Sequence, residues 1–328
     1  MDIPGTLQES LNFLHNDLHA MTREESIRKA VLRGIALNRT PGLHFPGNLL
    51  GVSFERVSSE DSLLTLEPDP HCIDADGQMN FGALALLADI ALAGTIRAML
   101  ERTTRLGTVS LSLQFSGAPW AGRLTATARS DGFFRRGAGR LGVSRATLSN
   151  SEGIVCTGTG TFMVLTPPKD IVLHPVPHRR RDEPPVALIA HYALTREERE
   201  ITRRADAALE NGDGFLDQFW GYTAHRTEQG ATGAMKNGPH NGNRVGHAQG
   251  GILMGFAAAT AKAALPSNWA LSAITASYIS PGEGVTLRAR SRIVHHGRLT
   301  SVIHTQIKGK NNRVVLDVTT NHMRRSES

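Results

Sequence analysis

Residues Asp74–Gly82 read DADGQMNFG, and residues Asn243–Gly251 read NRVGHAQGG. Both stretches have a polar residue, a glycine three positions later and a second polar residue three positions after that. Each stretch leads directly into a long run of Ala, Leu and Ile. Because the same loop precedes the same kind of helix twice, the sequence predicts a tandem repeat.

Other landmarks return in the same order in both halves. Residues 22–25 and 195–198 both read TREE, the Thr-x-x-Glu capping box that begins an amphipathic helix. Two long units of this kind predict a duplicated domain rather than a solenoid. The further matched segments are Gly51–Phe54 with Gly221–Ala224, Gln114–Ser116 with Ser277–Ile279, and Gly139–Leu141 with Gly297–Leu299.

The chain of 328 residues is long enough for about two domains. We expect a first repeat over residues 1–166, in which residues 1 to about 20 are peripheral, and a second repeat over residues 186–328. Residues 167–185, rich in Pro and Arg, are the expected linker, because proline is excluded from helix interiors and central strands.

Hydrophobic periodicity predicts the same α+β plan for each repeat, with one long helix inside a run of antiparallel strands. The predicted helices span about 22–37, 80–101, 195–210 and 249–264. The predicted strands span about 49–57, 63–66, 108–115, 123–130, 141–148, 153–165, 220–226 and 231–236, with four more ending near residue 323.

Composition restricts the class of protein. No apolar run reaches the roughly 18 residues of a membrane span, and the first ten residues lack a signal-peptide core, so we expect a cytoplasmic protein without a membrane span. Two cysteines, Cys72 and Cys156, exclude a disulfide framework and a cysteine-based metal site. The net charge of +6 is spread along the chain, which favours a phosphate-bearing small molecule over nucleic acid, or no anionic partner at all.

Asp89 stands out within the apolar helix that follows the first loop. A sheet wrapped around one helix buries that helix on several sides, which explains why residues 83–93 are almost entirely apolar. A carboxylate in this setting is costly unless it is used or paired. The alternative to a catalytic role is a structural one, in which Asp89 pairs with a buried arginine.

These residues resemble the hotdog-fold thioesterases of the phenylacetate-pathway (PaaI-like) type, whose signature is Asn-x-x-Gly-x-x-His-Gly-Gly followed by a helix carrying Asp or Glu. The resemblance covers both repeats and implies a double hotdog acting on acyl-CoA or another acyl thioester. In that family the Asn and the first Gly of the pair come from one protomer and the carboxylate comes from the other.

Helix geometry gives an independent reason for such sharing. Asp89 lies eight residues after Phe81, so the two are about 12 Å apart along one helix. An oxyanion donor and a base must both lie about 3 Å from the reacting group. One helix cannot supply both, whereas two antiparallel helices can.

The two copies have lost complementary parts of the family pattern. Asn243 and Gly250 from the second repeat, with Asp89 and Thr108 from the first, make one complete site. The opposite combination has a bulky side chain at the donor position and lacks a helix acid, so we predict that it is inactive. Its residues are Asp74, Phe81, Ala258 and Leu271.

The resemblance implies thioester hydrolysis without a cofactor. The N–H of Gly250 would polarise the thioester oxygen at a helix N-terminus, and Asp89 would act as general base or as nucleophile. Thr108 would hold the attacking water or Asp89, and Asn243 would fix the loop or the substrate carbonyl. Gln249 stands where relatives have His.

Further substrate contacts are expected at Gln249 and Gly251, and at Arg140 and Arg298, which resemble a Gly-Arg pair near the CoA phosphates in relatives. Plain hairpin arginines are the alternative. By resemblance we also expect a homo-oligomer, a dimer of pseudodimers.

The same residues leave two other functions to consider. A hotdog dehydratase or hydratase would usually pair a histidine with the acid, and Gln249 and Asn80 disfavour it. A non-catalytic acyl-binding module would leave Asp89 structural. His240 and His247 lack metal-ligand spacing, so we expect no metal. The Gly-x-Gly-x-x-Gly stretch at residues 137–142 has no helix after it and predicts a hairpin turn instead of a dinucleotide site.

Overall fold

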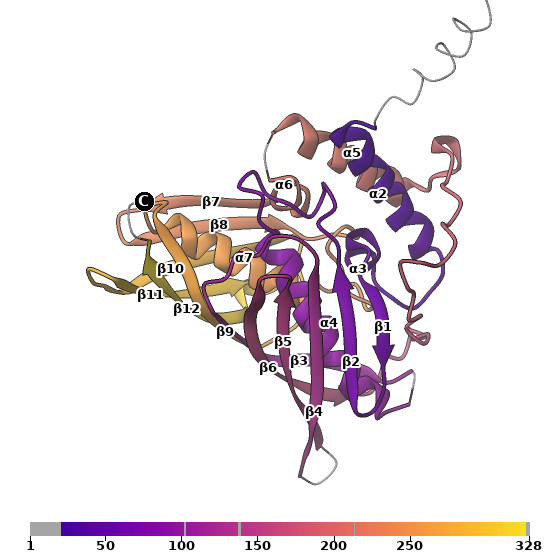
Figure 1. Cartoon of the computed structure of the whole chain (residues 1–328), viewed down its shortest axis with the longest axis horizontal. Helices are drawn as coiled ribbons and strands as arrows, with labels where there is room; N and C mark the ends of the chain where they lie inside the picture. Colours follow the sequence, from indigo (N-terminus) through magenta and orange to yellow (C-terminus); the bar gives the residue numbers. More distant parts are fainter. Residues whose placement is uncertain (1–20, 102, 137–138, 213, 326–328) are drawn as a thin grey trace, which may run out of the picture.

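The computed structural model describes residues 21–101, 103–136, 139–212 and 214–325. Their strands form one continuous antiparallel sheet in the order β1-β2-β4-β5-β6-β3-β9-β12-β11-β10-β8-β7 (Figure 1). The strands of the first repeat are β1 Ser53–Val57, β2 Asp61–Leu66, β3 Arg105–Phe115, β4 Leu124–Arg136, β5 Gly139–Asn150 and β6 Gly153–Leu165. Those of the second are β7 Tyr222–Thr227, β8 Gly230–Lys236, β9 Trp269–Tyr278, β10 Thr286–His296, β11 Thr300–Lys308 and β12 Val314–Arg324.

The two repeats meet at the middle of this sheet, where β3 pairs with β9. Ser112 lies opposite Thr275, and their side-chain oxygens are 2.9 Å apart. Strand order is mirrored on either side of this pair, as a pseudo-twofold axis requires. The predicted α+β double hotdog is therefore confirmed.

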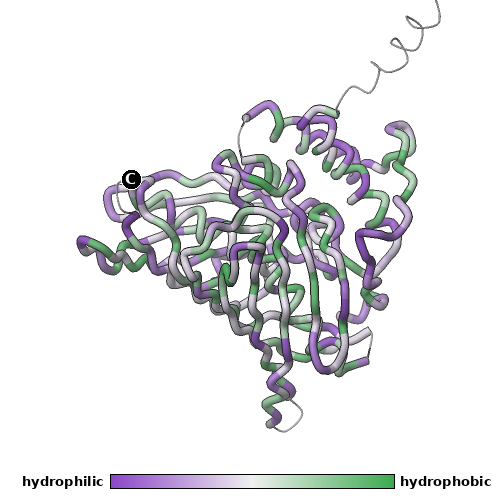
Figure 2. Tube along the Cα trace, viewed as in Figure 1, coloured by the Kyte–Doolittle hydropathy of each residue, from purple (hydrophilic) through white to green (hydrophobic). Residues whose placement is uncertain are grey.

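Each half of the sheet wraps one long helix, α4 (Phe81–Ala98) in the first repeat and α7 (Gly250–Ala263) in the second. Asn80 and Gln249 are their N-cap residues, and the side chain of each accepts a hydrogen bond from the first turn. Both helices are apolar on nearly every face because sheet and partner helix surround them. Alternating hydrophobic and hydrophilic residues along the strands fit a sheet with one buried face (Figure 2).

Glycines allow the two central helices to touch. A Cβ added at Gly251 would lie 2.5 Å from the Leu86 Cα of the other helix, and one added at Gly255 would lie 2.9 Å from the Gly82 Cα. No side chain fits at such separations. The small residues therefore fix how closely the two repeats approach at the place where a shared site must form.

Helix α4 is long and apolar enough to cross a membrane by length and composition alone, although Asp89 and Arg97 interrupt its apolar run. Most of it, 67%, is buried inside the protein. The sheet therefore takes the place that lipid would otherwise occupy.

Two amphipathic helices, α2 (Arg23–Asn38) and α5 (Arg196–Glu210), lie side by side outside the sheet. Both begin with the predicted capping box. The side chains of Thr22 and Thr195 accept hydrogen bonds from the backbone N–H of the N3 residue, and the N3 glutamate side chain accepts one from the backbone N–H of the threonine. Arg39 bridges the repeats, because its guanidinium lies 2.7 Å from the Glu198 carboxylate.

The strands predicted over residues 49–57 and 220–226 begin later than expected. Short helices α3 (Phe45–Leu50) and α6 (Phe215–Trp220) occupy their first residues. Each helix ends at a glycine in the left-handed region, Gly51 and Gly221. The sequence prediction missed this because a short buried helix and a buried strand share the same apolar composition.

The expected linker contains no helix or strand in the structure and runs over the first repeat. The Phe54 N–H donates to the Arg179 carbonyl at 2.8 Å, and Arg181 pairs with Asp69 at 2.9 Å. Leu173 is buried. The segment is thus anchored to the first repeat at Arg179 and Arg181. The expected peripheral residues 1–20 lie outside the described residues.

Candidate active site

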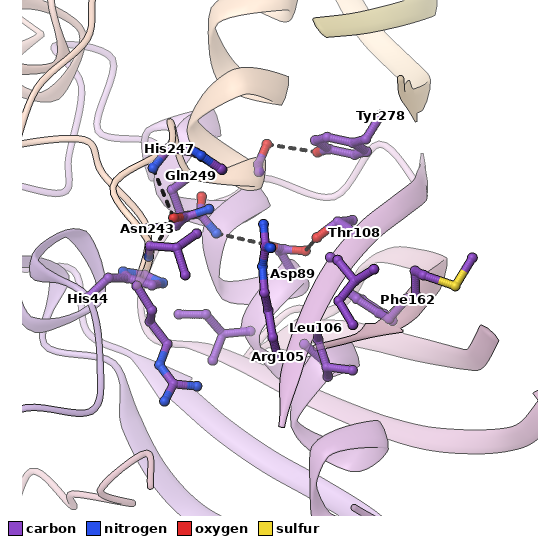
Figure 3. A pocket seen from close by; sticks show the side chains of 18 of the residues that line it. His44, Asp89, Arg105, Leu106, Thr108, Phe162, Asn243, His247, Gln249 and Tyr278 are labelled. Carbon is purple, nitrogen blue, oxygen red and sulfur yellow. Dashed lines mark hydrogen bonds between the residues drawn. The ribbon is translucent and has the colours of Figure 1, made fainter. Parts of the chain in front are cut away.

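A cavity of about 320 Å³ opens at the seam between the repeats (Figure 3). The first repeat contributes residues of α4, β3, β6 and the linker. The second contributes the loop before α7, residues of α7 itself, and residues 278–282 at the end of β9 and after it. Asp89, Thr108, Asn243, Gln249 and Gly250 all line it.

Asp89 projects from the middle of α4 and is only 6% exposed. The Thr108 hydroxyl donates to its Oδ1 at 3.1 Å, and Gln249 Nε2 donates to its Oδ2 at 2.7 Å. Thr108 comes from the first repeat and Gln249 from the second. The carboxylate is therefore fixed by both repeats at once.

Burial raises the pKa of Asp89 to about 6. The hydrogen bonds from Thr108 and Gln249, and the positive charge of Arg97, oppose that rise but do not cancel it. A carboxylate with a pKa near 6 is ionised at neutral pH and is a stronger base than a solvated aspartate. Such a group is matched to accepting a proton at physiological pH.

Gly250 is the first residue of α7, where a backbone N–H has no acceptor within its own helix. A Cβ added at Gly250 would lie 3.2 Å from Asp89 Oδ2 and 3.4 Å from Thr108 Oγ1. The space beside this glycine therefore faces the carboxylate directly. A helix N-terminus and a base of the other repeat thus border the same small volume.

Tyr278 also borders this volume, and the sequence reasoning did not single it out as a site residue. Its hydroxyl donates to the Gly250 carbonyl at 2.7 Å, which fixes the start of α7. Burial raises the pKa of this hydroxyl well above its usual value, so it stays protonated as a donor. The sequence signal was available, since Ser277–Ile279 matches Gln114–Ser116.

Gln249 holds Asp89 and the helix start together. Its Oε1 accepts from the Ile252 N–H at 3.0 Å while its Nε2 donates to Asp89. The side chain is 3% exposed, and both ends are in use. We expected Gln249 to contact substrate, whereas both of its side-chain hydrogen bonds are made within the protein and position the Asp89 carboxylate.

Asn243 organises the loop before α7. Its Oδ1 accepts from the backbone N–H groups of Val245 and His247, at 2.9 and 3.1 Å. Of the two roles considered from sequence, this geometry corresponds to fixing the loop. His247 lines the cavity and lies 3.2 Å from Glu283, while His240 is buried against Phe219 outside it.

Three of the expected substrate contacts lie away from the cavity. Gly251 faces the backbone of α4 at the helix crossing. Arg140 lies over the Phe133 ring, 4.7 Å from its centroid, in the β4–β5 hairpin. Arg298 is exposed in the turn between β10 and β11. Residues 137–138 of the glycine-rich stretch lie outside the described residues.

Arginines that the sequence reasoning did not single out line the cavity instead. Arg97 follows Asp89 by eight residues on α4, Arg105 begins β3, and Arg244 follows Asn243 in the loop. The helical spacing from Asp89 could have indicated Arg97. The other two come from loop and strand ends whose directions only the fold decides.

The pseudosymmetric counterpart of the site has a different character. Phe81 takes the place of Gly250 there, and it packs with Phe115 and Trp120 at centroid distances of 6.1 and 5.8 Å. Ala258 takes the place of Asp89 and is buried. The counterpart thus has an aromatic side chain at the donor position and an alanine at the carboxylate position, and its expected inactivity stays a prediction.

Comparisons with known proteins agree with the fold. Residues 239–323 match the family model described as "Acyl-CoA thioesterase N-terminal domain". A candidate oleoyl thioesterase from Lactobacillus plantarum is similar with a TM-score of 0.53 and 10% identity, over 83% of this chain and 99% of that one. A hot dog fold protein of unknown function from Alicyclobacillus acidocaldarius has a TM-score of 0.50 and 12% identity, over 84% and 96%.

No curated protein matches the sequence. The family match covers residues 239–323 of the second repeat and does not distinguish the phenylacetate-pathway type, so that narrower resemblance stays a prediction. At such low identities the structural likeness shows the double hotdog fold alone.

Proposed function

We propose that this chain hydrolyses acyl thioesters, with acyl-CoA as the substrate class, at one site shared by the two repeats. One observation carries the proposal. The carboxylate of Asp89, from the first repeat, lies beside the first residue of α7, from the second. The family match over residues 239–323 supports the same class of reaction.

The thioester carbonyl oxygen would accept a hydrogen bond from the Gly250 N–H. Negative charge that develops on this oxygen is stabilised by the positive end of the α7 dipole. The Tyr278 hydroxyl donates to the carbonyl of the same residue and so holds the start of α7 in place. The donor is therefore in place before substrate binds, which is the condition for efficient electrostatic stabilisation.

Asp89 can act in two ways. As general base it takes a proton from water, which attacks the carbonyl carbon, and the tetrahedral intermediate then expels the thiolate, which takes up the proton. As nucleophile it forms an acyl anhydride with loss of the thiolate, and water then hydrolyses the anhydride. Single-turnover hydrolysis in oxygen-18 water identifies the nucleophilic route by label in the Asp89 side chain, because water that attacks the Asp89 carbonyl of the anhydride leaves its oxygen there, whereas the general-base route labels only the acid product.

The proposal is tested by a hydrolysis screen over CoA thioesters of varied length and polarity. Wild type and Asp89→Ala are compared with Asp74→Asn. Asp74 is a matched control, because burial also raises its pKa to about 6 while it hydrogen-bonds Asn80 away from the cavity. We expect Asp89→Ala to lose at least about 100-fold in kcat/KM and Asp74→Asn to keep its activity.

A wild-type protein that binds CoA thioesters without hydrolysing any would be an acyl-binding module instead. Full activity of Asp89→Ala would also overturn the proposed mechanism. The expected dimer of pseudodimers and the expected cytoplasmic location stay predictions.

A further inference from the structure

The cavity continues past Asp89 along one face of α4. Ile90, Ala93 and Gly94 line it, followed by Arg97. Arg97 lies eight residues beyond Asp89, about 12 Å along the helix axis. A substrate group bound at Arg97 is therefore separated from the reacting carbon by a chain of several atoms.

Two arginines, Arg97 and Arg244, line the cavity at this far end. Arg97 Nη1 donates to the Thr104 carbonyl at 2.8 Å, and Arg244 Nη2 donates to the His174 carbonyl. Within the described residues, neither forms an ion pair with a carboxylate. Each arginine is oriented by a backbone oxygen and has further N–H donors that the protein does not pair with an acid.

Neither guanidinium at this end is paired directly with a carboxylate among the described residues. Burial lowers the pKa of Arg97 to about 10 and the charge of Arg244 adds to that effect, while the charge of Asp89 opposes it. Burial and the same two arginines lower the pKa of His44 to about 4, so this neighbour is neutral. Two cations near each other in a partly buried site are costly unless an anion compensates them.

The walls that lead to the arginines are apolar. Their apolar side chains come from the first repeat and from the linker that covers it, namely Leu43, Leu106, Phe162, Leu165, Leu173 and Val176, and Arg105 of β3 also lines the cavity. Such walls suit a hydrocarbon chain. A hydrocarbon chain that ends at two guanidinium groups requires an anionic end group.

We propose that the acyl group of the substrate ends in a carboxylate, which Arg97 and Arg244 bind, so that the substrate is a monothioester of a dicarboxylic acid. This inference rests on the thioester hydrolysis proposed above. A guanidinium matches the geometry of a carboxylate with two parallel hydrogen bonds. The distance from Asp89 to Arg97 then selects the length of the acyl chain.

The phosphates of CoA are the other source of an oxyanion. The structure favours the acyl carboxylate, because the linker lines this end of the cavity: Leu173 is only 6% exposed, and the His174 carbonyl accepts from Arg244. On the second-repeat side, Ile279 is 59% exposed, and a nucleotide could leave toward solvent there.

The experiment measures kcat/KM for carboxylate-ended acyl-CoA and methyl-ended acyl-CoA of equal length. The same two acyl groups are also offered as pantetheine thioesters, which lack the nucleotide and its phosphates. We expect wild type to prefer the carboxylate by about 10- to 100-fold on both carriers. In Arg244→Met and Arg97→Met the ratio between the two acyl groups should fall toward one.

Arg226→Met is the matched control, since Arg226 is an exposed arginine on β7. It should keep the wild-type preference. Arg97 is part of the central helix, so its replacement could impair folding, and Arg244, on a loop, then tests the site alone. Melting temperatures confirm that each variant is folded.

Three results would overturn the inference. If wild type hydrolyses methyl-ended acyl-CoA through Asp89 without preferring a carboxylate, the inference fails and the proposed function stands. If Arg244→Met slows both CoA thioesters but neither pantetheine thioester, the arginines bind the CoA phosphates. If wild type hydrolyses no thioester, the proposed function and this inference fail together.

Discussion

Replacing Asp89 by Asn should make the protein more stable and less active. The pKa of Asp89 is raised from its usual 3.8 to about 6 by burial. Asn has nearly the same shape and no charge. Its amide oxygen can accept from Gln249 and its amide nitrogen can donate to the Thr108 hydroxyl, so both hydrogen bonds persist.

The magnitude follows from the difference between the folded and unfolded pKa values. Each pH unit between them corresponds to about 1.4 kcal/mol, so ionised Asp89 costs the folded state about 3 kcal/mol at about pH 7.5. The folded pKa is the higher one, so the folded state holds the proton more tightly. Asp89 therefore contributes a loss of stability as the pH rises between about 4 and 6, and Asp89→Asn lacks this contribution, while that of Asp74 is the same in both proteins.

The assay compares denaturant unfolding of the two proteins at about pH 4 and about pH 7.5. We expect the variant to exceed wild type by up to about 3 kcal/mol in free energy of unfolding at the higher pH, and by less than about 1 kcal/mol at the lower. Its hydrolysis should fall by at least about 100-fold. A variant destabilised equally at both pH values would refute the reasoning, because burial of a charge would then not dominate at this position.

Four further changes probe the same seam. The kcat/KM of wild type should fall as the pH drops through about 6, where Asp89 takes up its proton. Thr108→Val removes the hydroxyl that donates to Asp89 and should move the midpoint of this pH profile up by about one pH unit. An unmoved midpoint would contradict the role of the hydroxyl. Gly250→Ala puts a methyl group 3.2 Å from the Asp89 carboxylate and should lower kcat/KM about 100-fold with little change in melting temperature. Gly251→Ala forces a Cβ to 2.5 Å from the backbone of α4 and should lower the free energy of unfolding by about 3 kcal/mol in a denaturant titration. Phe81→Ala should cost about 2 kcal/mol of stability and keep the rate of hydrolysis, and a large loss of rate would show that the pseudosymmetric position takes part.

Much of the fold could be predicted because it is encoded locally. The paired loops before α4 and α7, the two capping boxes and the alternating strands each depend on residues a few positions apart. The bounds of α3 and α6 could not be predicted, since six buried residues are too few for periodicity to separate helix from strand. The same limit explains the strands that begin later than expected.

The residues of the site likewise include some that could be predicted from the sequence and some that could not. The repeat pattern, compared with the signature of the family that it resembles, brought Asp89 and Gly250 forward as partners, since each copy lacks what the other retains. Arg140 was also brought forward by its local pattern, yet its guanidinium lies over Phe133 in a hairpin. A glycine turn fixes where a side chain begins but not which distant surface it meets.

Sequence by itself determined that this chain is a duplicated α+β unit, in which the first repeat has the acid, Asp89, and the second has an unobstructed helix N-terminus at Gly250. Tertiary structure decided that Gln249 reaches across the seam to Asp89, that Tyr278 fixes the helix start, and that Arg97 and Arg244 share one cavity. The physical reason is that these contacts join segments up to 160 residues apart. Their geometry depends on the helix crossing and on the β3–β9 pairing, which no local pattern records.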